Sequence, residues 1–232
     1  MSIDNGFVVV TEGVTKEYSE NGIPVMALRG IDLKIAKSEF TAIVGPSGSG
    51  KTTFLNVISG LDSVSDGEVW LGGKLLSVMS GKELSDFRRD NIGFIFQAYN
   101  LIPVLTVEEN IEYIMLLQGV SKDERHERVM NILREVGLDD YGSRLPSKLS
   151  GGQQQRVAIA RAMVAKPKLI LADEPTANLD STSANALIDM MRRLNEESGV
   201  TFIFSTHDVK IMDKARRLIE LKDGLIDTDD VR

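Results

Sequence analysis

The sequence of 232 residues contains no cysteine. This absence excludes disulfide bonds, thiol catalysis and metal sites built from cysteine ligands, and it fits a reducing compartment. No stretch approaches 18 consecutive apolar residues, so we expect no segment that spans a membrane by itself. The first six residues, MSIDNG, lack a basic region followed by an apolar one, so we also expect no signal peptide.

An excess of basic residues is missing as well. The formal net charge is −7 and the isoelectric point is about 5.0, which disfavours a nucleic-acid partner because such proteins usually carry a basic face. A local basic patch stays compatible with these values. With 42% hydrophobic and 26% charged residues, the composition is typical of a soluble globular protein, and the length suffices for a large core in one or two domains.

The remaining sequence is organised around one glycine-rich stretch. Residues 45–53 (GPSGSGKTT) follow an apolar run at 40–44 and precede a helix-like segment at 54–58. The order of strand, glycine-rich loop and helix, with the spacing G-x-x-x-x-G-K-[ST], is typical of a phosphate-binding loop. A glycine-rich turn without a ligand is the alternative, and the flanking strand and helix disfavour it.

Each residue type in this phosphate-binding loop suits a nucleotide. The glycines let backbone N–H groups turn inward to form an anion-binding nest, and the helix N-terminus adds partial positive charge. Lys51 can reach the β- and γ-phosphates, and the Thr52 hydroxyl can bind Mg²⁺. We therefore expect nucleotide contacts from Gly45, Ser47, Gly48, Ser49, Gly50, Lys51, Thr52 and Thr53.

Hydrophobic patterning places this loop in an α/β chain. Strands predicted at residues 7–10, near 14, at 28–35 and at 67–74 suggest a small antiparallel sheet. Further strands are predicted at 91–97, 168–172, 200–205 and 217–221, the last followed by a turn at 223–224. Helical spacing predicts helices at 80–89, from 107 onward, and at 121–136, 153–165 and 183–197. The helical stretch 107–137 therefore reads as an insertion in the α/β pattern.

A second motif follows one of the predicted strands. Asp173 and Glu174 come directly after the apolar residues 169–172, so they lie at the carboxyl edge of a parallel sheet, where such folds bind ligands. Asp173 is expected to hold Mg²⁺, directly or through water, and Glu174 to polarise an attacking water molecule. Acidic residues often follow strands for no such reason, but the phosphate-binding loop favours the functional interpretation.

The third motif is residues 149–153 (LSGGQ). Ser150, Gly151 and Gly152 expose a second helix N-terminus with free N–H groups, which makes a second phosphate site. An ordinary Ser-Gly helix cap is the alternative, and the position shortly before the Asp173 strand disfavours it. This stretch resembles the signature motif of the ATP-binding cassette (ABC) ATPases, so the resemblance implies nucleotide contacts from these three residues.

Other positions match the same family in its own order. Gln97 is similar to the glutamine that senses Mg²⁺ and water and links to the helical subdomain, and His207 to the histidine that contacts the γ-phosphate. Asp180 matches the family's D-loop aspartate, and Tyr18 matches an aromatic residue that stacks on adenine, although a core or surface tyrosine is the alternative. The resemblance implies catalysis by Glu174, His207, Gln97 and Lys51, and metal binding by Thr52, Gln97 and Asp173.

The resemblance covers about residues 7–226. It implies a single ABC ATPase domain over 1–232, an α/β P-loop NTPase fold with a RecA-like parallel-sheet core, an N-terminal antiparallel β subdomain and a helical subdomain inserted at about 98–165. The subgroup that the motifs resemble is the lipoprotein-release and macrolide-exporter type (LolD-like, MacB-like). One departure is Ala177, where the family commonly has glycine, and it matters only if that position requires a positive φ.

The family resemblance also implies partners. Two cassettes would form a head-to-tail homodimer that encloses two ATP molecules with Mg²⁺, and the dimer would drive a separate permease. The chain would then be a cytoplasmic protein held at the cytoplasmic face of the inner or plasma membrane. The apolar cluster at Tyr99 and 101–105 could receive a permease helix, or face the core instead. A soluble ABC ATPase and a regulatory ATP-binding module are the competing functions.

Overall fold

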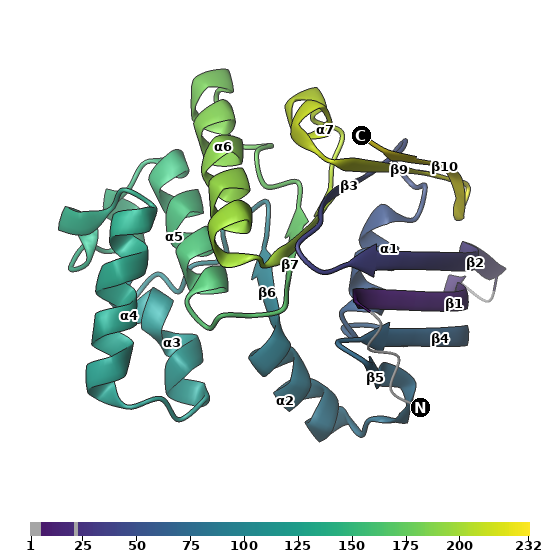
Figure 1. The fold of residues 1–232 in the computed structure, drawn as a ribbon, viewed down its shortest axis with the longest axis horizontal. Coiled ribbons are helices and arrows are strands. Elements are labelled where there is room, and N and C mark those ends of the chain that lie inside the picture. The colour runs from purple at the N-terminus through teal and green to yellow at the C-terminus, as the bar shows by residue number, and fades with distance from the viewer. Residues whose placement is uncertain (1–5, 21–22) are drawn as a thin grey trace.

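The computed structural model describes residues 6–20 and 23–232, so the N-terminal residues 1–5 considered for a signal peptide lie outside the described part. Two β-sheets dominate the fold (Figure 1). A four-stranded antiparallel sheet has the order β2-β1-β4-β5, and a six-stranded sheet has the order β10-β9-β3-β8-β7-β6. Of the helices in the described residues, none has the length and apolarity needed to cross a bilayer.

The antiparallel sheet is made by β1 (Phe7–Glu20), β2 (Ile23–Ala36), β4 (Asp66–Leu71) and β5 (Lys74–Leu75). The sequence predicts two short strands where the structure has the single 14-residue strand β1. The polar break between them is a bulge, because the register against β2 shifts between Thr11 and Val14, and Gly13 adopts φ 58°. A bulge therefore replaces the expected interruption.

The second sheet contains β3 (Phe40–Val44), β6 (Ile92–Ile95), β7 (Leu169–Asp173), β8 (Thr201–Ser205), β9 (Arg217–Lys222) and β10 (Leu225–Val231). The first five of these strands pair in parallel, and β10 pairs antiparallel with β9. The sequence does not predict β10, because three aspartates lower its strand propensity. Arg217 on β9 holds it by a two-pronged ion pair with Asp229, at 2.7 Å for both nitrogens.

Both faces of the parallel sheet are buried, which explains its continuous apolar strands. Successive residues alternate between two hydrophobic clusters: Phe202 and Phe204 face one, while Ile203 faces the other. The first cluster lies under the helices of the inserted segment and α6, and the second lies toward α1 and the antiparallel sheet. The central strands are therefore fixed from both sides, and so are the loops that follow them.

The helices are α1 (Lys51–Ile58), α2 (Gly81–Asn91), α3 (Val107–Leu117), α4 (Lys122–Glu135), α5 (Gly151–Met163), α6 (Ser181–Ser198) and α7 (Val209–Lys214), with short 3-10 turns at Leu76–Val78, Asp139–Tyr141 and Pro146–Lys148. Capping boxes begin α2 at Ser80 and α3 at Thr106, as the sequence predicts. Helix α5 begins two residues earlier than predicted, because Ser150 caps it in the same way. The sequence does not predict α7, whose six residues are too few for a visible helical period.

Candidate functional site

Four loops with polar residues meet at the carboxyl edge of the parallel sheet. Strand β3 leads into the phosphate-binding loop, β6 ends two residues before Gln97, and β7 ends at Asp173. Strand β8 ends at Ser205, which pairs in register with both Asp173 and Ile43. Because β3, β8, β7 and β6 are neighbours in that order, the loops that follow them form one row.

The phosphate-binding loop has the backbone geometry that its glycines predict. Gly45, Gly48 and Gly50 all have positive φ, at 141°, 78° and 104°. At Gly45 a Cβ would lie 2.1 Å from the backbone oxygen of Leu221, so any side chain there is excluded. Gly50 is the N-cap of α1 in the left-handed conformation, and the first turn of that helix therefore points its N–H groups at the loop.

Polar side chains of the loop are arranged for an anion. Lys51 Nζ donates to the backbone oxygens of Gly45 at 2.8 Å and Pro46 at 3.0 Å, so the ammonium curls over the loop. Ser49 Oγ is buried and has no hydrogen-bond partner among the described residues. A buried hydroxyl without a partner costs free energy, which a bound ligand accepting from it would recover.

A cavity of ≈ 690 Å³ opens over this row of loops. It brings together eleven of the residues predicted from the sequence for catalysis or metal and phosphate binding, together with Ala27, Pro46 and Ser205, which sequence reasoning does not single out. The predicted residues in its lining are Gly45, Ser47, Gly48, Gly50, Lys51, Thr52, Thr53, Gln97, Asp173, Glu174 and His207, of which the three glycines contribute backbone only. This volume is in the range of small-molecule sites.

Asp173 has an unusual electrostatic setting. Burial raises the pKa of its carboxyl above the ordinary value, and the neighbouring Glu174 charge raises it further. Hydrogen bonds from the Ser205 and Thr52 hydroxyls and the charge of Lys51 act in the opposite direction and do not cancel the rise. The first residue of the acidic pair is therefore physically joined to the phosphate-binding loop through Thr52.

Glu174 and His207 form one unit. Glu174 Oε1 lies 2.6 Å from His207 Nδ1, and its Oε2 accepts from the Thr206 hydroxyl at 3.1 Å. Glu174 has φ 45°, a conformation that is unfavourable for a residue with a side chain, and Ala177 does not. The positive φ of this loop thus falls on the acidic residue, so the alanine at 177 is accommodated without strain.

Gln97 is tied to the neighbouring loops through its backbone. Its carbonyl accepts from Asn178 Nδ2 at 2.9 Å, and the preceding Phe96 carbonyl accepts from Gln155 Nε2 at 3.4 Å. Gln155 also donates to the Pro175 carbonyl at 2.7 Å from helix α5. The Gln97 side chain is left exposed and faces the cavity.

The residues after Gln97 contact the helix that carries the LSGGQ motif. Tyr99 and Asn100 both have positive φ, at 59° and 49°, and Arg161 of α5 donates to both of their backbone oxygens, at 3.0 and 2.6 Å. A Cβ on Gly151 would lie 2.8 Å from the Tyr99 hydroxyl oxygen, so this glycine leaves room for that group. Helix α5 is thus hydrogen-bonded to the segment after β6 through Arg161, and the two approach each other closely at Gly151.

The structure does not bring the LSGGQ residues to the cavity within one chain. Ser150 caps α5 in a reciprocal pair with Gln153, and Gly151 and Gly152 form the first turn, none of them in the lining. Asp180 is also outside the lining and acts as the N-cap of α6, accepting from the backbone N–H groups of Thr182 and Ser183. The hydrogen bond from the Ser183 hydroxyl lowers the pKa of Asp180 below its ordinary value.

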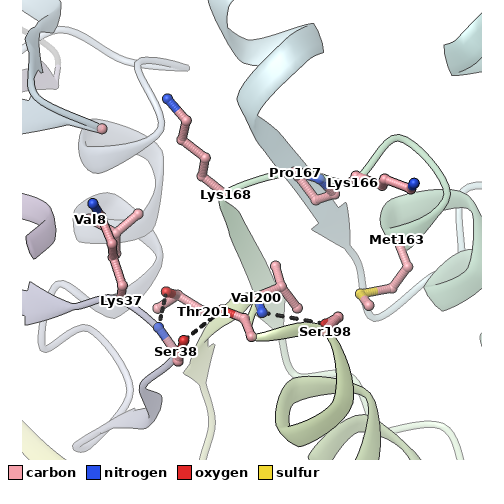
Figure 2. Close-up of a pocket in the computed structure, with 12 residues that line it drawn as sticks. Val8, Lys37, Ser38, Met163, Lys166, Pro167, Lys168, Ser198, Val200 and Thr201 are labelled. Carbon is pink, nitrogen blue, oxygen red and sulfur yellow. Dashed lines mark hydrogen bonds between the residues drawn. The ribbon is translucent and has the colours of Figure 1, made fainter. Parts of the chain in front are cut away.

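A second cavity, of ≈ 600 Å³, lies at the amino-terminal ends of β7 and β8 (Figure 2). Its lining lacks the catalytic and metal-binding groups of the first cavity. Lys166 and Lys168 contribute to its lining, but no carboxylate, amide or imidazole does. Hydroxyl groups in the lining already have partners within the protein. The Ser38 hydroxyl donates to the Gly199 carbonyl, and the Thr201 hydroxyl oxygen accepts from the Ser38 backbone N–H. The cavity at the carboxyl edge is therefore the candidate site.

Known proteins resemble this chain over nearly its whole length. The family profile described as ABC transporter matches residues 28–177. The ABC transporter ATP-binding protein YtrE of Bacillus subtilis is 42% identical over 224 residues, which cover 97% of this chain and 94% of the relative. The macrolide export ATP-binding/permease protein MacB of Marinobacter nauticus is 43% identical over 217 residues, which are 94% of this chain but only 34% of that protein.

A solved structure resembles the chain equally well. It is a dimeric ATP-binding cassette in a post-hydrolysis state, bound to ADP and Pi. It is 41% identical to this chain, with a TM-score of 0.88, and the match covers 96% of this chain and 98% of that one.

Proposed function

The chain belongs to the ABC transporter family, as an ATP-binding and ATP-hydrolysing subunit, and from this premise we propose that it works as a head-to-tail homodimer which drives a separate membrane permease. The observation that carries the proposal is the separation of two phosphate-binding elements. The cavity holds the phosphate-binding loop and the acidic pair, while the LSGGQ helix N-terminus lies outside it.

Two incomplete sites on one chain are satisfied by a second copy. The N-terminus of α5, with an exposed Ser150 and two half-buried glycines, is an anion-binding element that lies outside the cavity lining. In a head-to-tail pair, it would close over the nucleotide held by the other copy, and Asp180 would lie at the same seam. ATP would then hold the dimer together, and its hydrolysis would release the two copies.

The cavity residues divide the chemistry between them. Lys51 and the loop glycines would bind the β- and γ-phosphates, and Glu174 would take the proton from an attacking water molecule. His207, bonded to Glu174 and exposed on its other side, would orient that carboxylate and contact the γ-phosphate. Gln97, which faces the same cavity, would sense whether water and metal are in place.

The donor set also fits Mg²⁺. Thr52, Gln97 and Asp173 offer a hydroxyl, an amide oxygen and a carboxylate, and Mg²⁺ prefers such oxygen ligands. The hydrogen bond between the Thr52 and Asp173 side chains brings two of these three metal-ligand candidates together. When bound, the ion would neutralise charge on the phosphates during hydrolysis.

We expect Asp173→Asn to stabilise the nucleotide-free chain while it removes Mg²⁺-dependent hydrolysis. Because the pKa of Asp173 is raised in the folded chain, the folded state binds this proton more tightly than the unfolded one. The ionised carboxylate therefore costs stability at neutral pH, and this cost disappears as the pH falls below the ordinary aspartate range. Asparagine keeps the size but carries no charge.

Thermal melts at neutral and acidic pH measure this effect. The variant should melt at a higher temperature than the parent at pH 7, and the difference should shrink as the pH is lowered. Asp230→Asn, at an exposed aspartate of β10, is the matched control and should change neither the melting temperature nor hydrolysis. A variant that melts below the parent at pH 7 would show that the carboxylate supports the fold.

A groove beside the inserted helices is suited to a permease. It has a volume of ≈ 270 Å³ and is lined by Phe94, Phe96, Ile102 and Tyr113 among others. Two of its lining residues, Ile102 and Tyr113, are exposed apolar side chains, and Val104, two residues after Ile102 along the chain, is 79% exposed. Of the predicted apolar cluster, Leu101 packs on the core, which supports the core interpretation for that residue. Docking by the exposed members of the cluster is our proposal. The groove would receive a cytoplasmic segment of the permease.

The permease assignment has a direct test. The tagged chain is captured from detergent-solubilised membranes of its source cells, and co-purifying integral membrane proteins are identified by mass spectrometry. Val104→Asp should reduce that recovery about tenfold or more, because it buries a charge in the interface, while ATP hydrolysis by the isolated chain stays unchanged. Val78→Asp, at an equally exposed apolar site on a 3-10 turn, is the control. Recovery that is equal for both variants would contradict docking here.

The subgroup proposal is lipoprotein release or export, as in LolD-like and MacB-like cassettes, with the chain held at the cytoplasmic membrane face by its permease and without a nucleic-acid partner. A soluble or regulatory ABC ATPase is the alternative. The paired Glu174 and His207 favour a hydrolytic cassette over a regulatory one. A permease with cytoplasmic loops that match the groove would favour transport over a soluble role.

A further inference from the structure

The hydroxyl end of Tyr18 is held by a carboxylate from another part of the chain. Its phenolic oxygen donates to Asp62 Oδ2 at 2.7 Å. Asp62 lies in the loop after α1, and its backbone N–H returns to the Asn56 carbonyl of that helix at 3.1 Å. The Thr53 side chain, in the first turn of α1, also hydrogen-bonds the phenol. Tyr18 is therefore fixed against the helix that begins at the phosphate-binding loop.

Lys16 holds the same carboxylate from the opposite side. Its Nζ donates to Asp62 Oδ1 at 2.6 Å and to the Ser63 carbonyl at 2.7 Å, and its side chain is only 9% exposed. Because Lys16 and Tyr18 are two residues apart on β1, they share one face of the strand. The same ammonium lies 4.9 Å from the centre of the Tyr18 ring.

The protonation states keep this arrangement together. Burial raises the pKa of Asp62, but hydrogen bonds from Lys16 and Tyr18 outweigh it and hold the pKa below its ordinary value. Burial, followed by the hydrogen bond to Asp62, raises the pKa of Tyr18. At neutral pH the carboxylate is thus an acceptor and the phenol a donor, so their hydrogen bond does not depend on small changes in pH.

We propose that Asp62 and Lys16 are positioning residues for recognition of the nucleotide base. Asp62 fixes the hydroxyl and Lys16 occupies the space over the ring at cation–π distance, so the purine has one defined side on which to stack. The ring itself stays open to solvent, with Tyr18 38% exposed. This inference rests on the proposed stacking of Tyr18 on adenine, and it names what prepares the ring before the base arrives.

Pre-organisation of this kind predicts a loss confined to base-containing ligands. Ordering one free side chain on binding corresponds to roughly a two- to tenfold change in affinity. Tyr18→Phe and Asp62→Asn should each weaken Mg-ATP binding by about this factor, raise KM for ATP and leave kcat unchanged. Mg-tripolyphosphate, which has no base, should bind equally to the parent and to both variants.

The binding measurements are made by calorimetry on the full chain. Tyr18→Phe leaves the Lys16–Asp62 ion pair in place, so it tests the hydroxyl contact even if Asp62→Asn lowers stability. Asparagine has a single acceptor oxygen, and the Lys16 ammonium, which can only donate, engages it, so Asp62→Asn and Tyr18→Phe both remove the hydrogen bond that the phenol donates. The double variant should therefore bind ATP no more weakly than either single variant. Glu68→Gln, at an exposed carboxylate of β4, is the matched control and should bind both ligands normally.

Each contrary result has a separate meaning. If Tyr18→Ala weakens ATP binding but Tyr18→Phe and Asp62→Asn do not, the stacking stands and the positioning role is overturned. If Asp62→Asn weakens ATP and tripolyphosphate equally, the residue acts on the loop as a whole, and the positioning role is again overturned. If Tyr18→Ala leaves ATP affinity unchanged while hydrolysis persists, stacking and positioning both fail, and the assignment of the hydrolytic site is untouched.

Discussion

Lys51→Ala is expected to lower ATP hydrolysis by a factor of about 10² to 10³, the usual loss when one charge-assisted contact to the reacting group is removed. The Lys51 ammonium already lies at the loop, donating to the Gly45 and Pro46 carbonyls, so no rearrangement of the backbone is needed to bring it to a phosphate. It also lies near Asp173, whose raised pKa it partly offsets.

Phosphate release from Mg-ATP measures this loss at saturating and at limiting substrate. Lys82→Ala, at an exposed lysine of α2, is the matched control and should keep the parental rate. Because the hydrogen bonds of the Lys51 ammonium within residues 6–20 and 23–232 go to backbone carbonyls of its own loop, the variant should stay folded, which a thermal melt verifies. A parental rate in Lys51→Ala would refute the phosphate-binding assignment.

Glu174→Gln is the second change with a large expected effect. Removing a general base typically costs a factor of about 10² to 10⁴ in rate. Glutamine can keep the hydrogen bonds to His207 and Thr206 but cannot accept a proton, so the geometry stays while the chemistry stops. We expect normal ATP affinity with hydrolysis reduced by at least a hundredfold.

Single-turnover phosphate release separates chemistry from binding in this variant. Glu127→Gln, at an exposed glutamate of α4, serves as the control and should hydrolyse ATP at the parental rate. If Glu174→Gln hydrolysed ATP as fast as the parent, another group in the cavity would have to take the proton, and the role of Glu174 would be wrong.

Much of the fold follows from local patterns in the sequence. The buried strands β3, β7 and β8 are visible as continuous apolar runs, since both faces of each strand are covered. The capping residues Ser80 and Thr106 mark helix starts because their side chains satisfy free N–H groups. Strand β10 could not be predicted, because its own residues have low strand propensity. It is stabilised by the ion pair between Asp229 and Arg217 of β9, which no local pattern in the sequence reveals.

For the candidate site, the sequence predicts individual residues but not the contacts between them. The motifs name Lys51, Asp173 and Glu174, because each follows a strand whose end is recognisable. The hydrogen bond between Glu174 and His207 joins residues 33 positions apart, and no sequence spacing reveals it. The same holds for the bond from Tyr18 to Asp62, 44 positions away, which only the packing of β1 against the loop after α1 creates.

The separation of the LSGGQ helix from the cavity is the least visible feature in the sequence. Both elements resemble phosphate sites, and nothing in their spacing says whether one chain unites them. In the structure, α5 is fixed by Arg161 and Gln155 to the segments after β6 and β7, so its N-terminus is held in place outside the cavity lining. This fixed separation is the reason to expect a second copy of the chain.

The central claim is that two copies of the chain form a dimer around bound ATP. The most direct test is the mass of the Glu174→Gln variant in solution with Mg-ATP, measured by sedimentation velocity. The account predicts a monomer without nucleotide, a dimer with Mg-ATP, and a monomer again when Lys51→Ala is added to remove phosphate binding. A Glu174→Gln chain that binds Mg-ATP and still sediments as a monomer would contradict it.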